Sequence, residues 1–288
     1  MLRRLKKAKK VLIGLLLVAL VTLGAGSLID QWLFKVPIFG FHNIIAGRGG
    51  KESYLDYTQS DLEKFLNPLV EGDYWFLDTD SLYRYFLTKS QPIPAEHKGQ
   101  KPVMITFDDG WKSMKTYVLP TLEKIEARTN KKVKIVLFVN PNSVKVAETG
   151  KPAHRSKKYI NCSDIKEGFE KSYFDIQGHG FSHKKLTTLG IDDLRAELSE
   201  GKDFVKNCLV GLNNTESVMS HIAYAYNKVN RRVRKYAAKY YLSGYLYNNE
   251  TLRLGWWSDP YRIPRLRVYR QDIPEKLIKL AAASSPIK

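Results

Sequence analysis

The stretch MITFDDGW, residues 104–111, places two carboxylates, Asp108 and Asp109, at the end of an apolar run. The run has the composition of a buried strand, and Gly110 permits a turn after it. Adjacent carboxylates repel each other when water is excluded, and a nearby cation relieves that repulsion. An Asp-Asp-Gly sequence is also a common turn. The pair by itself therefore leaves a turn and a cation site both open.

A second polar pair lies in GHGFSHKKL, residues 178–186, where His179 and His183 follow another apolar run. Two imidazoles four residues apart can reach one metal ion, although such pairs also occur as ordinary polar surface. One carboxylate and two imidazoles leave coordination positions open, as in catalytic rather than structural metal sites. Cys162 and Cys208 lie far from both motifs and do not suit a thiolate site. They could pair in an oxidising compartment, and the sequence does not decide whether they do.

Strand-like and helix-like segments alternate through the chain and have to position these pairs. Strands are expected at 35–42, 101–107, 132–140, 173–180, 217–226, 242–247 and 262–268, and helices at 60–70, 117–128, 191–209, 229–240 and from about 273. The alternation predicts an α/β fold with a parallel sheet. So many units in one domain, residues 33–288, favour a closed or nearly closed (β/α) barrel. Active sites of such barrels lie at the carboxyl ends of the strands, where both polar pairs fall.

The N-terminal segment, residues 1–32, reads as a membrane anchor. Residues 1–10 carry six Lys or Arg and no acid, and residues 11–29 contain no charge. Nineteen residues at helical rise are about long enough to cross the ~30 Å hydrocarbon core. The basic flank should stay in the cytoplasm, so the catalytic domain is expected on the extracytoplasmic side of the cell membrane. A cleaved signal peptide, which would release a secreted protein, is the alternative.

The net charge of the chain is +18. Residues 1–10 supply six of these charges, which leaves +12 on the rest. An exported basic domain suggests anionic surroundings, such as cell-wall polymers or lipid headgroups. Nucleic acid is the usual alternative partner of a basic protein, but the predicted export and the lack of a recognition motif argue against it.

TFDDG followed about seventy residues later by His-x-x-x-His is similar to the first two motifs of the polysaccharide deacetylase family, also called the NodB-homology domain. The resemblance covers about residues 35–285. It implies a distorted (β/α) barrel and metal-dependent hydrolysis of the N-acetyl group on aminosugar polymers. It also implies that Asp109, His179 and His183 bind a divalent metal, most often Zn²⁺ with Co²⁺ or Ni²⁺ as alternatives. Asp108 would then be the general base.

The family's third motif is matched loosely by HIAYAYNKVN, residues 221–230. Tyr224 and Tyr226 stand in the region that would bind substrate, and the backbone N–H near Tyr226 is a candidate for an oxyanion site. Core packing explains the two tyrosines equally well.

A later segment, GWWSDPYRIPRLRV, resembles the part of the family that closes the pocket. Trp256 or Trp257 is a candidate platform for a sugar, with burial in the core as the alternative. Arg265 is a candidate substrate-binding residue and a candidate partner for Asp108. The family's late general-acid histidine is missing, because no histidine follows His221. His42, at the end of the first strand, is the expected catalytic substitute, with a hydrogen-bonded histidine near the core as the alternative.

The opening VPIFGFHNI, the TFDDGW and IPRLRV segments and the missing late histidine most resemble exported deacetylases of biofilm poly-β-1,6-N-acetylglucosamine. The expected partner is therefore an N-acetylglucosamine polysaccharide. A deacetylase of peptidoglycan or of β-1,4-linked chitin oligomers is one alternative. A catalytically weak, membrane-tethered polysaccharide-binding module is the other.

Overall fold

The computed structural model describes residues 33–50, 52–149, 158–255 and 258–288. The expected anchor, residues 1–32, and the two tryptophans Trp256 and Trp257 lie outside these ranges. Among the residues that are described, no helix is both long enough and apolar enough to cross a membrane. Residues Lys35–Lys288 form one structural unit.

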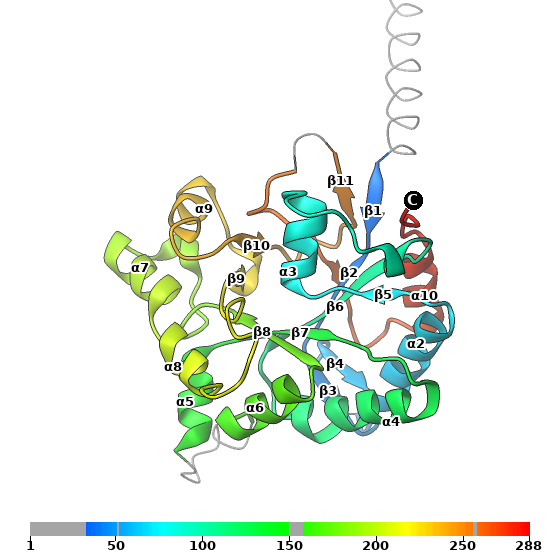
Figure 1. Cartoon of the computed structure of the whole chain (residues 1–288). Helices are drawn as coiled ribbons and strands as arrows, with labels where there is room; N and C mark the ends of the chain where they lie inside the picture. The colour runs from blue at the N-terminus through cyan, green and yellow to red at the C-terminus, as the bar shows by residue number, and fades with distance from the viewer. Residues whose placement is uncertain (1–32, 51, 150–157, 256–257) are drawn as a thin grey trace, which may run out of the picture. The chain divides into compact units, whose positions relative to one another are not determined.

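A curled parallel sheet forms the centre of this unit (Figure 1). Its strands follow the order β10-β9-β8-β7-β6-β2-β12, and β5 pairs with the beginning of β6. All these pairs are parallel, as the alternation of strands and helices predicts. The bounds are β2 Ile38–Phe41, β5 Trp75–Phe76, β6 Pro102–Asp109, β7 Ile135–Val139, β8 Phe174–Gly178, β9 His221–Ala223, β10 Ser243–Tyr245 and β12 Leu266–Arg267. Two further pairs, β1 (Phe34–Val36) with β11 (Leu252–Leu254) and β3 (Asn43–Ile45) with β4 (Asp56–Thr58), lie outside this sheet.

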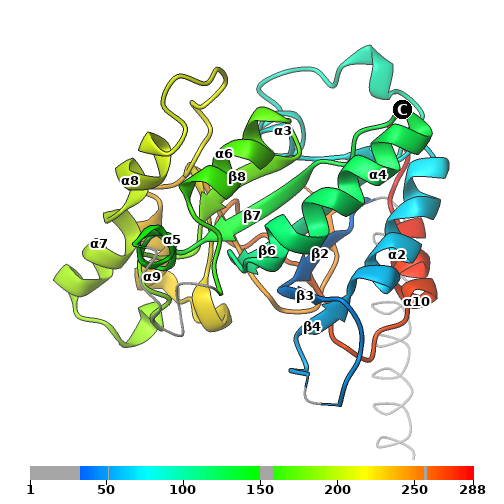
Figure 2. The ribbon, with the colours of Figure 1, turned by 90° about the horizontal axis from the view of Figure 1, so that it is seen from below.

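The helices pack around the outside of the curled sheet (Figure 2). Helices α2, α4 and α10 lie side by side along one part of it. The α-helices are α2 Gln59–Glu71, α3 Thr79–Ser81, α4 Leu119–Thr129, α5 Pro141–Glu148, α6 Cys162–Glu170, α7 Ile191–Ser199, α8 Lys202–Asn207, α9 Arg231–Ala237 and α10 Pro274–Ala282. Short 3-10 or π-helical turns are η1 Leu82–Leu87, η2 Ala95–His97, η3 Met114–Val118, η4 Leu186–Thr188 and η5 Ala225–Asn227.

The two faces of the sheet differ in polarity because side chains alternate along a strand. Ile105 and Phe107 of β6 belong to the main hydrophobic core beneath the helices. The intervening Thr106 and Asp108 face the inside of the curl, where they are buried. Other fully buried polar side chains are Gln177, His221, Ser243 and Arg265. The inside of the sheet therefore carries buried polar side chains among apolar ones such as Met104 and Phe138, and the polar side chains lead up to the carboxyl ends of the strands.

The chain after β10 bridges the two edges of the sheet. The Gly244 N–H donates to the Pro260 carbonyl at 2.8 Å, and Tyr245 pairs with Ile263. A few residues later Leu266 pairs with Phe39 of β2. The described residues thus form a curled, parallel half-barrel with helices outside. At this level the expected α/β fold is confirmed.

The helix expected over 191–209 is wrong in one respect, because it is two helices. α7 ends at Ser199 and α8 begins at Lys202, and between them Gly201 adopts φ +73°. Residues other than glycine rarely adopt this left-handed conformation, so the helix breaks there. Helices α5 and α6 were not expected from the sequence. Cys162, the first residue of α6, forms a disulfide with Cys208, directly after α8.

Candidate active site

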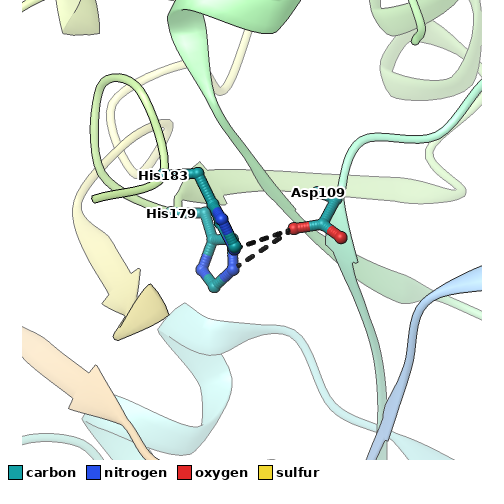
Figure 3. Close-up of side chains that lie close together, drawn as sticks. All are labelled: Asp109, His179 and His183. Carbon is teal, nitrogen blue, oxygen red and sulfur yellow. Dashed lines mark ion pairs between the residues drawn. The ribbon is translucent and has the colours of Figure 1, made fainter. Parts of the chain in front are cut away.

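Asp109, His179 and His183 meet at the carboxyl ends of β6 and β8, the strands on either side of β7 (Figure 3). Asp109 ends β6 and pairs with Val139 of β7, while His179 follows β8 directly. The Asp109 Oδ1 atom lies 3.5 Å from His179 Nε2 and 3.2 Å from His183 Nε2. The structure therefore brings together the three residues that the sequence predicts as metal ligands.

The backbone leaves regular strand geometry at each of these turns. Asp109 has φ +74° and His183 has φ +61°. Gly110, directly after Asp109, and Gly180, directly after His179, also have positive φ. The left-handed backbone at Asp109 ends the alternation that would direct its side chain towards the outer core. Such conformations cost on the order of 1–3 kcal/mol for residues other than glycine and persist where the surroundings enforce them.

Hydrogen bonds with neighbouring groups determine which atoms of these three side chains remain available to bind a metal ion. The Trp111 indole N–H donates to Asp109 Oδ2 at 3.1 Å, and the buried Oδ1 has no hydrogen-bond partner among the described residues. The Nδ1 of His179 lies 2.8 Å from the Ala223 carbonyl oxygen, which can only accept a hydrogen bond. His179 therefore carries its proton on Nδ1, and the lone pair of Nε2 faces Asp109.

These atoms fit a divalent metal ion. A buried carboxylate oxygen without a donor and two imidazole nitrogens, all within 4.8 Å of one another, form a borderline N/O ligand set. Burial lowers the pKa of the His179 imidazole, which favours the neutral ring that coordinates metal. Three protein ligands would leave positions for water and substrate.

Asp108, on the inner face of β6, forms a buried two-pronged ion pair with Arg265. The Nη1 and Nη2 atoms of Arg265 donate to Asp108 Oδ1 and Oδ2 at 2.6 and 2.8 Å. Arg265 also donates to the Thr106 hydroxyl and to the Leu246 carbonyl. Burial alone would raise the pKa of Asp108, but the guanidinium and the nearby His179 outweigh it and hold this pKa well below its usual range.

Asp108 is consequently ionised at neutral pH, and its Oδ2 lies 4.0 Å from His179 Nε2, beside the ligand cluster. An ionised carboxylate can accept a proton from a water at that cluster. Its low pKa makes it a weak base, so the water has to be acidified, and this is the chemistry that a divalent metal supplies when bound.

A cavity of about 440 Å³ opens over the cluster and is lined by Asp108, Asp109, His179 and His183. His42 also lines it, and its buried Nδ1 has no hydrogen-bond partner among the described residues. A histidine with an uncommitted ring nitrogen at this position is compatible with proton transfer. The expected role of His42 stays a prediction.

The two tyrosines of the loosely matched motif separate in the structure. Tyr226 is 53% exposed, has φ +57°, and its ring centroid lies 4.5 Å from that of His183. Tyr224 is 1% exposed and its hydroxyl donates to the Tyr261 carbonyl, so its side chain packs in the core although the residue borders the cavity.

The expected substrate-binding role of Arg265 needs correction. Its side chain is 0% exposed and its guanidinium is committed to Asp108, Thr106 and Leu246. The expectation that Arg265 is the partner of Asp108 agrees with this geometry. Contact with a sugar does not, because burial removes the side chain from the cavity surface. The expected sugar platform, Trp256 or Trp257, lies outside the described residues.

The sequence did not reveal the rest of the cavity wall. Tyr54, Tyr247, Tyr269 and Arg267 line it, together with Lys185, Asn227 and Lys228. Of these, Arg267 carried a signal in the sequence, because it stands two residues after Arg265 in IPRLRV and a strand directs both side chains to one face. A second cavity, of about 500 Å³, shares Asp109, His183 and Tyr226 with the first and includes the ring pair Trp111 and Tyr159.

The model of the polysaccharide deacetylase family matches residues 95–244, which include both motifs of the ligand cluster. The chain belongs to the polysaccharide deacetylase family. As a member it is a carbohydrate de-N-acetylase, a hydrolase. No curated protein matches the chain.

Solved structures of deacetylases share the fold of this enzyme. BC0361, a polysaccharide deacetylase from Bacillus cereus, is 19% identical with a TM-score of 0.69, over 86% of this chain and 69% of its own. The deacetylase PplD of Streptococcus pyogenes, solved with acetate, is 22% identical with a TM-score of 0.68, over 86% and 98%. IcaB from Ammonifex degensii is 16% identical with a TM-score of 0.63, over 86% and 96%. At these identities the likeness supports the fold alone.

Proposed function

We propose that this deacetylase hydrolyses the N-acetyl group of N-acetylglucosamine residues with a divalent metal, most simply Zn²⁺, held by Asp109, His179 and His183. The observation that carries the proposal is the convergence of these three side chains beside an ionised carboxylate, Asp108. In this scheme Asp108 accepts the proton of the attacking water, and His42, which lines the cavity, is the candidate source of the proton for the leaving amine.

The proposed substrate is an extracellular N-acetylglucosamine polymer, with poly-β-1,6-N-acetylglucosamine as the first candidate. Support for the β-1,6 linkage comes from the segments VPIFGFHNI, TFDDGW and IPRLRV and from the absence of a histidine after His221. Two cavities that share lining residues at the ligand cluster suit a polymer, because sugars on either side of the reacting residue need room.

The decisive experiment measures acetate release by the full chain from β-1,6- and β-1,4-linked N-acetylglucosamine oligomers. The metal is first removed with a chelator and then restored. Release from the β-1,6 oligomer only with metal supports the proposal, and release from the β-1,4 oligomer alone moves the enzyme to peptidoglycan or chitin substrates. The Asp108→Asn variant should bind metal but release no acetate. If the wild type binds both metal and oligomer but releases no acetate, the protein is instead a polysaccharide-binding module.

We also propose that the catalytic domain works outside the cytoplasm, on a single-pass anchor or as a secreted protein. The Cys162–Cys208 disulfide supports this location, because disulfides persist mainly in oxidising compartments. The charge distribution of residues 1–29 supports it independently. Protease digestion of intact cells tests the proposal, since a domain that is degraded only after lysis would contradict it.

A further inference from the structure

Arg265 and Arg267 lie two residues apart and direct their side chains to the same face of the sheet, but their surroundings differ. Arg265 is fully buried, and Asp108 neutralises its charge. Arg267, the last residue of β12, is partly exposed and lines the active-site cavity. No carboxylate of the described residues pairs with Arg267. Its charge is therefore available to a ligand in the cavity.

The guanidinium of Arg267 is nevertheless held in place. Its Nε donates to the Tyr247 carbonyl at 2.8 Å and its Nη1 donates to the Tyr269 hydroxyl at 3.4 Å. The guanidinium also lies over the Tyr247 ring, 5.6 Å from the centroid. Its Nη2 donates to no described residue. An oriented guanidinium loses little freedom when it binds, and its planar fork matches the oxygens of a phosphate or a carboxylate.

Two lysines extend the positive charge around the cavity. Lys185 and Lys228 are exposed residues that line it, and neither has a carboxylate partner in the described part of the chain. The acidic residues that line the cavity are Asp108, which Arg265 neutralises, and Asp109, in the ligand cluster. A basic chain carries lysines on many faces, so the lysines alone would mean little. A neutral sugar does not require an oriented guanidinium, so the argument rests on Arg267.

We infer that the substrate carries an oxyanion, a phosphate or a carboxylate, on or beside the N-acetylated sugar, and that Arg267 binds it. The inference rests on the proposed deacetylase function and names the substrate class more closely. Clefts lined by charge of one sign concentrate ligands of the other sign, and charge-assisted hydrogen bonds are stronger than neutral ones. An unmodified N-acetylglucosamine polymer of either linkage carries no oxyanion, so the inference requires an anionic substituent on the β-1,6 polymer or an anionic alternative such as peptidoglycan.

The test compares three N-acetylglucosamine oligomers of one length as substrates of the metal-loaded full chain. One is neutral, one carries a phosphate ester on a C6 hydroxyl, and one contains a residue with a lactyl carboxylate. We expect kcat/KM of acetate release to be at least about tenfold higher for one or both anionic oligomers, mainly through a lower KM. High salt should reduce this preference. The two anionic arms distinguish a phosphate from a carboxylate.

Variants test whether Arg267 causes the preference for anionic oligomers. Arg267→Gln should reduce the anionic-to-neutral ratio to less than about twofold, and Arg267→Lys should keep part of it, because a point charge remains without the fork. Arg231→Gln removes the same charge from the exposed start of α9 and should keep the wild-type ratio. A ratio that survives in Arg267→Gln would overturn the assignment.

The experiment distinguishes failure of this inference from failure of the proposed function. Equal kcat/KM for neutral and anionic oligomers in the wild type overturns the inference of an anionic substrate, while the proposed deacetylase function stands. Absence of acetate from all three oligomers overturns the proposed function instead. In that case calorimetric binding of the oligomers to metal-loaded protein decides the inference, since equal affinity for neutral and anionic oligomers would refute it.

Discussion

Asp108 shows how a single carboxylate can stay ionised in a buried position. It is 3% exposed, and transfer of an unpaired charge from water to such a site costs several kcal/mol. Two hydrogen bonds from Arg265 offset this cost, and Thr106 and Leu246 hold the arginine in position. The charge state of Asp108 therefore depends on one residue that is 157 positions away in the sequence.

Replacement of the arginine, Arg265→Met, should destabilise the fold and stop turnover together. The variant leaves the Asp108 carboxylate buried without a partner, so the free energy of unfolding should fall by about 3–5 kcal/mol. Chemical denaturation followed by circular dichroism measures this, beside an assay of acetate release.

The double variant Asp108→Leu/Arg265→Met separates the two effects. It removes both charges, so it should regain at least half of the lost stability while acetate release stays absent. If the double variant is no more stable than Arg265→Met, the lost packing of Arg265, rather than the uncompensated charge, would explain the destabilisation.

A second prediction concerns Trp111, whose indole N–H donates to Asp109, a candidate metal ligand. Trp111→Phe keeps an aromatic ring but removes the donor, and metal affinity should fall by about tenfold or more. Competition with a coloured chelator measures the affinity. Trp75→Phe is the matched control, since Trp75 stacks on His97 at the start of the sheet. Equal affinity of Trp111→Phe and wild type would mean that Asp109 is oriented without the indole.

At this scale the sequence predicts the residues with distinctive spacing. Asp108, Asp109, His179 and His183 lie within short motifs, so their types and intervals are visible without a fold. Tyr247, Tyr269 and Arg267 have no such spacing relative to the motifs, because tertiary folding alone brings them to the cavity. The burial that separates Tyr224 from Tyr226 is equally invisible in the sequence, since both follow β9 in the same short segment.

The elements around the site act as supports for the turns that carry the histidines. Asn140, just before α5, donates its amide N–H groups to the carbonyls of His179 and Gly180. Gly201, between α7 and α8, packs against Pro141 of α5 and against Phe181. The break between α7 and α8 thus lies against the start of α5 and the histidine-bearing loop.

Substitution at this break should be costly. In Gly201→Ala the new Cβ would lie 2.4 Å from the Pro141 Cβ, at a residue with φ +73°. Strain and overpacking together should lower the free energy of unfolding by about 2–4 kcal/mol. Thermal or urea unfolding measures this. Gly47→Ala is the control, because no atom lies within 4 Å of its added Cβ and the change should stay within about 0.5 kcal/mol. Equal stability of the two variants would contradict the tight packing at Gly201.

Element type was easier to predict than element ends. The strands of the central sheet are buried apolar runs, and their periodicity is plain in the sequence. The break at Gly201 was missed because the hydrophobic period continues through 191–209, and because Pro141 and Phe181, which leave no room for a side chain at Gly201, are distant in sequence. Helix α6 was missed although its capping box, Asn161 with Asp164, is a local start signal.

At the scale of the whole molecule, a disulfide links two helices of the outer layer that are far apart in the sequence. The Cys162–Cys208 disulfide joins α6 to the end of α8 across 46 residues. This interval contains β8, His179 and His183, so the loop closed by the disulfide includes two of the three residues of the ligand cluster. The sequence leaves this pairing undecided, because the separation of two cysteines in space is a tertiary property.

Removal of the disulfide in Cys162→Ser/Cys208→Ser should lower the free energy of unfolding by about 2–4 kcal/mol, because the unfolded chain gains freedom. Thermal unfolding in the presence and absence of a reductant tests this. Reductant should lower the melting temperature of the wild type and leave that of the double variant unchanged. A wild-type melting temperature that is insensitive to complete reduction would contradict the prediction.

The segment from Pro260 to Arg267, which connects β10 to β2, also determines when the active site is complete during synthesis of the chain. A chain made from its N-terminus presents Asp108 and both histidines well before Arg265 exists. Until that last segment docks onto β2, Asp108 lacks its counter-ion and the cavity lacks the wall formed by Arg267. A nascent chain that ends before Arg265 is accordingly an inactive one, and hydrolysis begins only after this segment has been made and has folded against β2.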